Sequence, residues 1–79
     1  MTKAEIEQIL VKEIGIILGG VQVGEDKPLH ELGLDSMGFV ELLVFIEKKF
    51  NLKLVDSGLA RDNFKTVRIL ASSIFEKLR

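Results

Sequence analysis

Three stretches of the sequence repeat apolar side chains at the spacing of an α-helix, and this spacing restricts the fold more than any other feature. Each stretch places an apolar residue at every third or fourth position, which is the period of one helix face and not of a strand. The stretches cover about residues 3–18, 36–50 and 67–78. The pattern therefore predicts an all-α fold, a bundle of three main helices.

The ends of the helices are marked by residues that cap or break a helix. Thr2 and Glu5 have the spacing of a capping box before the first helix. Gly19-Gly20 follows that helix, and glycine readily adopts the left-handed conformation that ends one. Thr66 is expected to cap the last helix, and residues 56–62 to form one additional short helix. The core faces of the first and last helices are expected to be Ile6, Ile9, Leu10, Ile14, Ile17 and Leu18, and Val67, Leu70, Ala71, Ile74, Phe75 and Leu78.

Residues 21–34 form a long connection that is too apolar for a free linker. We expect it to lie across the core and to be punctuated by Pro28, which disfavours the helical conformation of the residue before it. Glu25-Asp26 is expected in a solvated turn, and His30 at the surface or as an anchor of the loop. The apolar anchors are expected to be Val21, Val23, Leu29, Leu32 and Leu34.

Length and composition exclude several classes of function. Seventy-nine residues make one small domain, residues 1–79, and the absence of cysteine excludes disulfides and thiolate metal sites. A single histidine leaves no pair for zinc and no Ser-His dyad. The net charge of −1 argues against nucleic acid, and the longest apolar stretch, residues 14–21, is too short to span a membrane. We expect a cytoplasmic monomer that is not an enzyme.

Asp35 and Ser36 stand at the start of the second helical stretch. Asp35 is a helix-starting residue, and Ser36 lies in the first turn, which no preceding turn covers. The N–H groups at a helix start favour a nearby phosphate. This is a suitable place for a phosphodiester, whereas no general base for a nucleophilic serine is evident.

The second stretch carries two apolar stripes. Turning about 100° per residue places one stripe over a wide arc that suits the core. The other stripe lies on the far side of Ser36, flanked by Glu41 and Lys48 on one edge and by Glu47 on the other. Periodicity alone allows this second stripe to pack under the long loop or to be exposed for binding a partner. The core stripe is Phe39, Leu42, Leu43, Ile46 and Phe50, and the second stripe is Met37, Val40 and Val44.

The motif Gly33-Leu34-Asp35-Ser36-Met37, followed by Val40-Glu41-Leu42, resembles that of the acyl carrier proteins, and the resemblance covers the whole chain. It implies an acyl-carrier-like bundle of three main helices plus one short helix. It also implies a 4′-phosphopantetheine arm on Ser36, attached from coenzyme A by a phosphopantetheinyl transferase that Asp35 helps to engage. The arm would carry acyl intermediates as thioesters for fatty acid, polyketide or other specialised biosynthesis.

The resemblance also implies which surface meets the partner enzymes. It favours an exposed second stripe, Met37, Val40 and Val44, with Glu41 and Glu47 as its charged rim. The expected partners are the transferase, a loading ligase or transferase, and ketosynthase-type or other acyl-processing enzymes.

The sequence departs from the fatty acid carriers in its less acidic second helix, where Gly38 follows Met37 and Lys48-Lys49 follows Glu47. These departures favour a specialised carrier over the housekeeping fatty acid carrier. An aminoacyl or peptidyl carrier, including a D-alanyl carrier, remains an alternative, and an unmodified helical interaction module is a more distant one.

Overall fold

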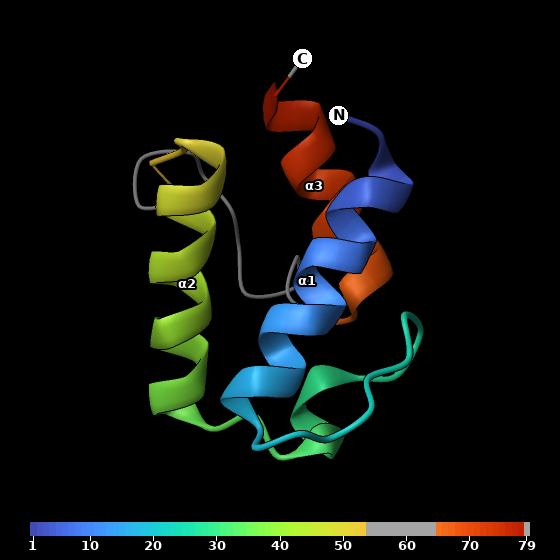
Figure 1. Ribbon diagram of the computed structural model, residues 1–79, viewed down its shortest axis with the longest axis vertical. Helices are drawn as coiled ribbons and strands as arrows, with labels where there is room; N and C mark the ends of the chain where they lie inside the picture. Colours follow the sequence, from blue (N-terminus) through green and yellow to red (C-terminus); the bar gives the residue numbers. More distant parts are fainter. Residues whose placement is uncertain (54–64, 79) are drawn as a thin grey trace.

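Helices of similar length pack side by side in the computed structural model, which describes residues 1–53 and 65–78 (Figure 1). In chain order these residues form α1 (Lys3–Ile17), a single 3-10 turn η1 (Leu29–Leu32), α2 (Ser36–Phe50) and α3 (Val67–Leu78). The described residues include no strand. Both α2 and α3 run opposite to α1 (Figure 1). The all-α prediction is confirmed, whereas the short helix expected at 56–62 lies outside the described residues.

The predicted capping box opens α1. The backbone N–H of Thr2 donates to Glu5 Oε1 at 2.8 Å, and the N–H of Glu5 donates to Thr2 Oγ1 at 3.2 Å. The hydrogen bond from the Thr2 backbone N–H favours the charged carboxylate and is the main reason that the pKa of Glu5 lies below its ordinary value. At the other end Gly19 and Gly20 have φ angles of 81° and 98°, so the left-handed stop was predicted correctly.

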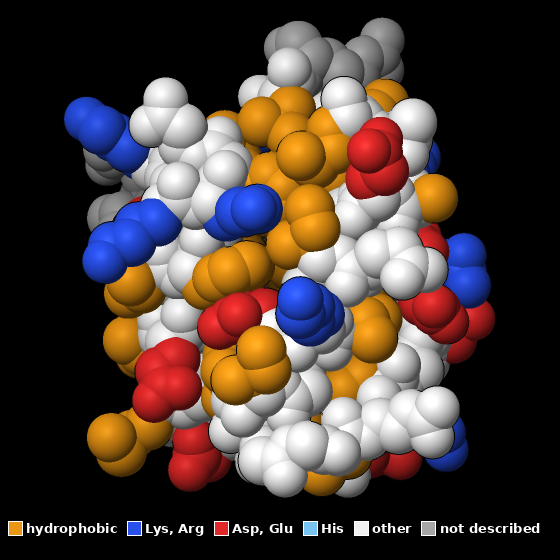
Figure 2. All heavy atoms as spheres, in the orientation of Figure 1, with side chains coloured by type: hydrophobic (Ala, Val, Ile, Leu, Met, Phe, Trp, Pro, Cys, Tyr) orange, Lys and Arg blue, Asp and Glu red, His pale blue; other side chains and the backbone are white. Residues whose placement is uncertain are grey.

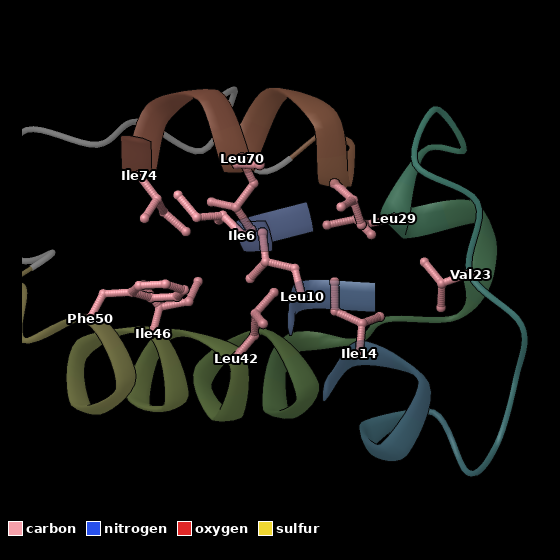
Figure 3. Close-up of a cluster of buried hydrophobic side chains, with 12 residues drawn as sticks. Ile6, Leu10, Ile14, Val23, Leu29, Leu42, Ile46, Phe50, Leu70 and Ile74 are labelled. Carbon is pink, nitrogen blue, oxygen red and sulfur yellow. The ribbon is translucent and has the colours of Figure 1, made fainter. Parts of the chain in front are cut away.

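The three helices meet in one core of aliphatic side chains (Figure 3). Val23 and Leu29, from the long connection, close one end of this core. Leu78 was expected in the core but is 41% exposed, because it lies in the last turn of α3 at the end of the bundle. The largest fully buried side chains are Ile6, Leu10, Ile14, Leu42, Ile46, Val67, Leu70 and Ile74.

The long connection lies across the core as expected, although not all of its apolar side chains are anchors. Val23 and Leu29 are buried, and Leu32 and Leu34 are half-buried against the core. Val21 is 43% exposed, so its prediction as an anchor was wrong. It directly follows the Gly19-Gly20 turn, where the chain is still at the surface, and only two residues later does the chain reach the core.

A polar cluster ties this connection to the start of α3. Arg68 Nε donates to Asp26 Oδ1 at 2.6 Å, and Arg68 Nη2 donates to Oδ2 at 3.2 Å. The backbone N–H of Arg68 donates to the carbonyl of Glu25 at 3.0 Å, and Arg68 Nη1 lies 3.8 Å from Glu7 Oε2 in α1. The hydrogen bond from Arg68 lowers the pKa of the Asp26 carboxyl. Asp26 is thus solvated, as expected, but it is also paired across 42 residues of sequence.

Candidate functional site

Asp35 sets the start of α2. Its backbone is extended, with φ −90° and ψ −174°, and its carbonyl accepts the N–H of Phe39 at 2.9 Å. Its side-chain Oδ1 accepts the N–H of Gly38 at 2.8 Å. One of the N–H groups that an α-helix leaves unbonded at its first turn is therefore capped by a carboxylate. The predicted helix start, with Asp35 as its cap, is confirmed.

Ser36 is the first residue of α2, and it is exposed. Its backbone is held by the turn that Asp35 caps, so the hydroxyl is presented to solvent from a fixed helix start. The positive end of the helix dipole lies at the same place and favours an attached or approaching phosphate. The sequence predicts that the Ser36 hydroxyl is a suitable place for a phosphodiester. In the structure Ser36 is accessible to another protein.

Gly38 has a packing role that sequence reasoning missed. It is buried in the first turn of α2, and a Cβ atom built on it would lie 2.9 Å from Leu34 Cδ1 and 3.3 Å from Ile17 Cγ2. A side chain there would press on the end of α1 and on the residue before Asp35. Glycine lets the start of α2 approach the end of α1 closely. No local pattern signals this, because Leu34 and Ile17 come together only in the fold.

The second apolar stripe of α2 lies at the surface and not under the long connection. Met37 is 75% exposed, Val40 55% and Val44 43%. Glu41 is exposed beside them, and Glu47 is half-buried. A shallow apolar depression of about 320 Å³ lies at the start of the stripe and is lined by Ser36, Met37, Val40 and Glu41. The accessible hydroxyl and the exposed stripe therefore form one continuous surface.

Charge is unevenly distributed along this surface. Figure 2 shows acidic side chains over the lower, N-terminal part of α2 and basic side chains over its upper part. Glu41 belongs to the first half of the helix, and Lys48 and Lys49 lie in its last turn. The lysines stand where the helix dipole favours positive charge. A partner that follows the whole stripe would meet both signs of charge.

Within residues 1–53 and 65–78, the other side chains that could bind a metal or catalyse a reaction do not come together in a site. These residues contain no group of three His, Asp or Glu side chains placed to hold a metal ion. His30 lies at the surface, one of the two positions expected for it, with Nε2 4.0 Å from Glu31 Oε2. Among the described helices, none is both long enough and apolar enough to cross a membrane.

Comparisons with known proteins identify the class to which this fold and site belong. A family model described as "Phosphopantetheine attachment site" matches residues 4–73. The chain therefore belongs to the phosphopantetheine-attachment family of carrier proteins. The cofactor that this family implies is a covalently attached 4′-phosphopantetheine. Its members generally act together with synthases and ligases and are generally not catalytic themselves.

The relatives of the chain include carriers of different kinds. It is 35% identical over 75 residues to phthioceranic/hydroxyphthioceranic acid synthase from Mycobacterium tuberculosis, a match that covers 95% of this chain but only 3% of the synthase. It is 32% identical over 53 residues to an acyl carrier protein from Campylobacter fetus, covering 67% of this chain and 68% of that one. It is 32% identical over 75 residues to a D-alanyl carrier protein from Streptococcus sanguinis, covering 94% and 91%. No solved structure was found to match.

The described residues fit the cofactor that the family implies. A phosphodiester needs an accessible hydroxyl, and Ser36 provides one at a helix start. The arm also needs open space beyond the phosphate, and the surface around Ser36 is hollowed and uncovered. The family match confirms the resemblance to carrier proteins, the cofactor and the carrier role that the sequence predicted.

Proposed function

We propose that Ser36 is the residue that carries the 4′-phosphopantetheine arm and that residues 1–79 act as a single carrier domain. The observation that carries this proposal is the exposed Ser36 hydroxyl at the dipole-positive start of α2, directly after a carboxylate cap. When bound, the arm supplies a terminal thiol that holds a cargo as a thioester. The protein itself supplies an anchor and a recognition surface and is not an enzyme.

Attachment requires a separate phosphopantetheinyl transferase and coenzyme A. Ser36 Oγ forms a bond to the phosphorus next to the pantetheine, and the phosphoanhydride bond of coenzyme A breaks. The serine proton passes to a base of the transferase, and adenosine 3′,5′-bisphosphate leaves. In this proposal Asp35 holds the first turn of α2 through its bond to Gly38 and presents its second carboxylate oxygen to the transferase.

The recognition surface in this proposal is the exposed stripe Met37, Val40 and Val44, with Glu41 and Glu47 as its charged rim. Apolar groups bordered by acidic side chains suit contacts with a basic partner surface that form quickly and release quickly. The expected partners are the transferase, an acyl- or aminoacyl-loading ligase or transferase, and ketosynthase-type or other acyl-processing enzymes. We expect a cytoplasmic monomer, with neither nucleic acid nor membrane as a partner.

The cargo that we propose is an acyl intermediate of a fatty acid, polyketide or other specialised pathway. Lys48 and Lys49 in the last turn of α2 support a specialised carrier, because they oppose a uniformly basic partner surface.

A second candidate cargo, an amino acid such as D-alanine, is favoured by one observation. The Streptococcus sanguinis D-alanyl carrier protein matches nearly end to end, over 91% of its length. Incubation of the arm-bearing protein with ATP and either a fatty acid and its activating ligase or D-alanine and its activating ligase distinguishes the two. The cargo whose mass is added to the protein is the one carried.

The attachment site itself is tested by intact mass after incubation with a transferase and coenzyme A. The wild-type protein should gain the mass of one phosphopantetheine group, whereas Ser36→Ala should gain none and keep its thermal midpoint. Ser57→Ala and Ser72→Ala are matched controls that should load normally. A Ser36→Ala protein that still gains the group would refute the site. A wild-type protein that gains nothing would favour an unmodified helical module.

A further inference from the structure

A second hollow lies beside Ser36 and is lined by both of its sequence neighbours, Asp35 and Met37. It has a volume of about 500 Å³ and runs between the end of α1 and the start of α2, which Figure 1 shows side by side. Ile17 at the end of α1 and the next two residues, Leu18 and Gly19, line one side, and Met37 and Gly38 of α2 line the other. It shares Met37 and Glu41 with the apolar depression that Ser36 itself lines, so the two hollows adjoin.

The lining of this groove restricts what it can bind. Its acidic members are Asp35 and Glu41, and none of the described residues that line it is basic. An anionic ligand would therefore be repelled. Its other walls are apolar side chains and glycine backbone, and its two carboxylates can accept hydrogen bonds. The groove suits a neutral, extended ligand that has both apolar groups and amide N–H donors.

We propose that the neutral part of the phosphopantetheine arm, beyond its phosphate, rests in this groove. The inference depends on the proposed attachment at Ser36, which adjoins the groove. The arm contains a dimethyl group that suits Met37 and Leu18, and two amide N–H groups for which the Glu41 carboxylate is a suitable acceptor. Because the arm is tethered next to the groove, its effective concentration is on the order of millimolar, so weak contacts suffice to hold it. Such contacts also release the arm readily.

The chain offers a matched pair of variants to test this. Gly19 lines the groove and Gly20 does not, yet both have left-handed φ angles, 81° and 98°, and open space where a Cβ would lie. Asparagine tolerates the left-handed conformation better than other non-glycine residues. Gly19→Asn would therefore place a side chain at the groove, whereas Gly20→Asn carries at least as much backbone strain without lining it.

The experiment uses the absence of cysteine from the chain. A thiol-reactive nitroxide attached to the arm-bearing protein labels only the thiol of the arm, and its broadening of backbone amide resonances shows where the arm lies. In the wild-type protein and in Gly20→Asn, we expect strong broadening at Leu18 and Gly33. In Gly19→Asn this broadening should fall at least twofold while that at Val44 does not fall.

Three results would overturn the inference. Equal broadening at Leu18 in all three proteins would mean that the arm does not use the groove, and strongest broadening at core residues such as Ile46 would place it in the interior. A wild-type protein in which attachment of the unlabelled arm leaves the Gly19 and Gly33 amide shifts unchanged would exclude the groove without any variant. Failure of the proposed function itself is distinct, because no arm would then be attached and the mass would not change.

Discussion

The two faces of α2 are both apolar, but they have opposite surroundings. The inner face places Leu42 and Ile46 in the core with no exposed area, and Phe50 is 6% exposed. The outer face leaves Met37 and Val40 more than half exposed. Burial of an aliphatic side chain stabilises a fold by about 1.5–3 kcal/mol. The inner face therefore holds the bundle together, whereas the outer face gains that free energy only when another molecule covers it.

The difference shows that one face of α2 stabilises the fold and the other face is available for recognition. A contiguous exposed apolar patch next to an accessible functional group is typical of a binding surface. The same helix start that Asp35 caps fixes both Ser36 and the outer face relative to the core. A partner that recognises the outer face would thus find the attachment point at a fixed distance along the helix.

The largest difference in the free energy of unfolding is expected between Leu42→Ala and Val40→Ala. The two residues lie two positions apart, on opposite faces of α2. Leu42→Ala should lower the free energy of unfolding by about 2–5 kcal/mol, because it leaves a cavity in the core. Val40→Ala should change it by no more than about 0.5 kcal/mol. Urea unfolding followed by circular dichroism measures both. Similar losses for the two variants would mean that the outer face also packs against the chain.

A charge on the outer face should affect recognition and not stability. Val44→Asp should lower kcat/KM of arm attachment by a transferase about tenfold, which corresponds to about 1.4 kcal/mol of binding energy in the transition state. Ile69→Asp is a matched control, since Ile69 is 41% exposed and lies on α3. An equal decrease in both variants would refute a specific role for the stripe.

The two roles of Asp35 can be separated by two substitutions. Asp35→Ala removes the cap of α2 and should cost about 1 kcal/mol of unfolding free energy, whereas Asp35→Asn keeps a capping oxygen and should cost much less. Both should slow arm attachment if the charge engages the transferase. Thr2→Ala, at the capped start of α1, should cost about as much as Asp35→Ala and leave attachment unchanged. Normal attachment in Asp35→Asn would contradict a role for the charge.

The smallest effect is expected at the Asp26–Arg68 pair, away from both faces of α2. Arg68 lowers the pKa of Asp26 in the folded state, so the pair stabilises the fold above the ordinary aspartate pKa of about 3.9. This contribution is lost as pH falls through the lowered pKa. Asp26→Asn should therefore lower the urea midpoint slightly at pH 7, with the difference closing at acid pH. A difference that persists there would show that the pair's charge is not its cause.

The helices and their ends were predictable because their signals are local. The capping box of Thr2 and Glu5, the Asp35 cap and the Gly19-Gly20 stop each act within a few residues. Thr66 Oγ1 also accepts the N–H of Ile69 at 3.1 Å, as expected of the cap of the last helix. Three main helices and the accessible start of α2 therefore follow from short-range rules.

Features that depend on distant residues were not predictable. Periodicity assigned one stripe of α2 to the core but did not say whether the second stripe is covered or exposed, and Val21 shows that an apolar loop residue need not be buried. The pairing of Asp26 with Arg68 and the contact of Gly38 with Ile17 join segments far apart in sequence. No single-sequence pattern reports such contacts, because they arise only when the helices pack.

The placement of the chain ends has one further consequence. The start of α1 and the end of α3 lie at one pole of the bundle, and the start of α2 lies at the opposite pole (Figure 1). Any polypeptide joined to either end would leave from the pole away from Ser36. The same architecture is thus suited both to a free-standing carrier and to a module joined to much larger domains. In neither arrangement would the joined polypeptide obstruct the pole where Ser36 lies.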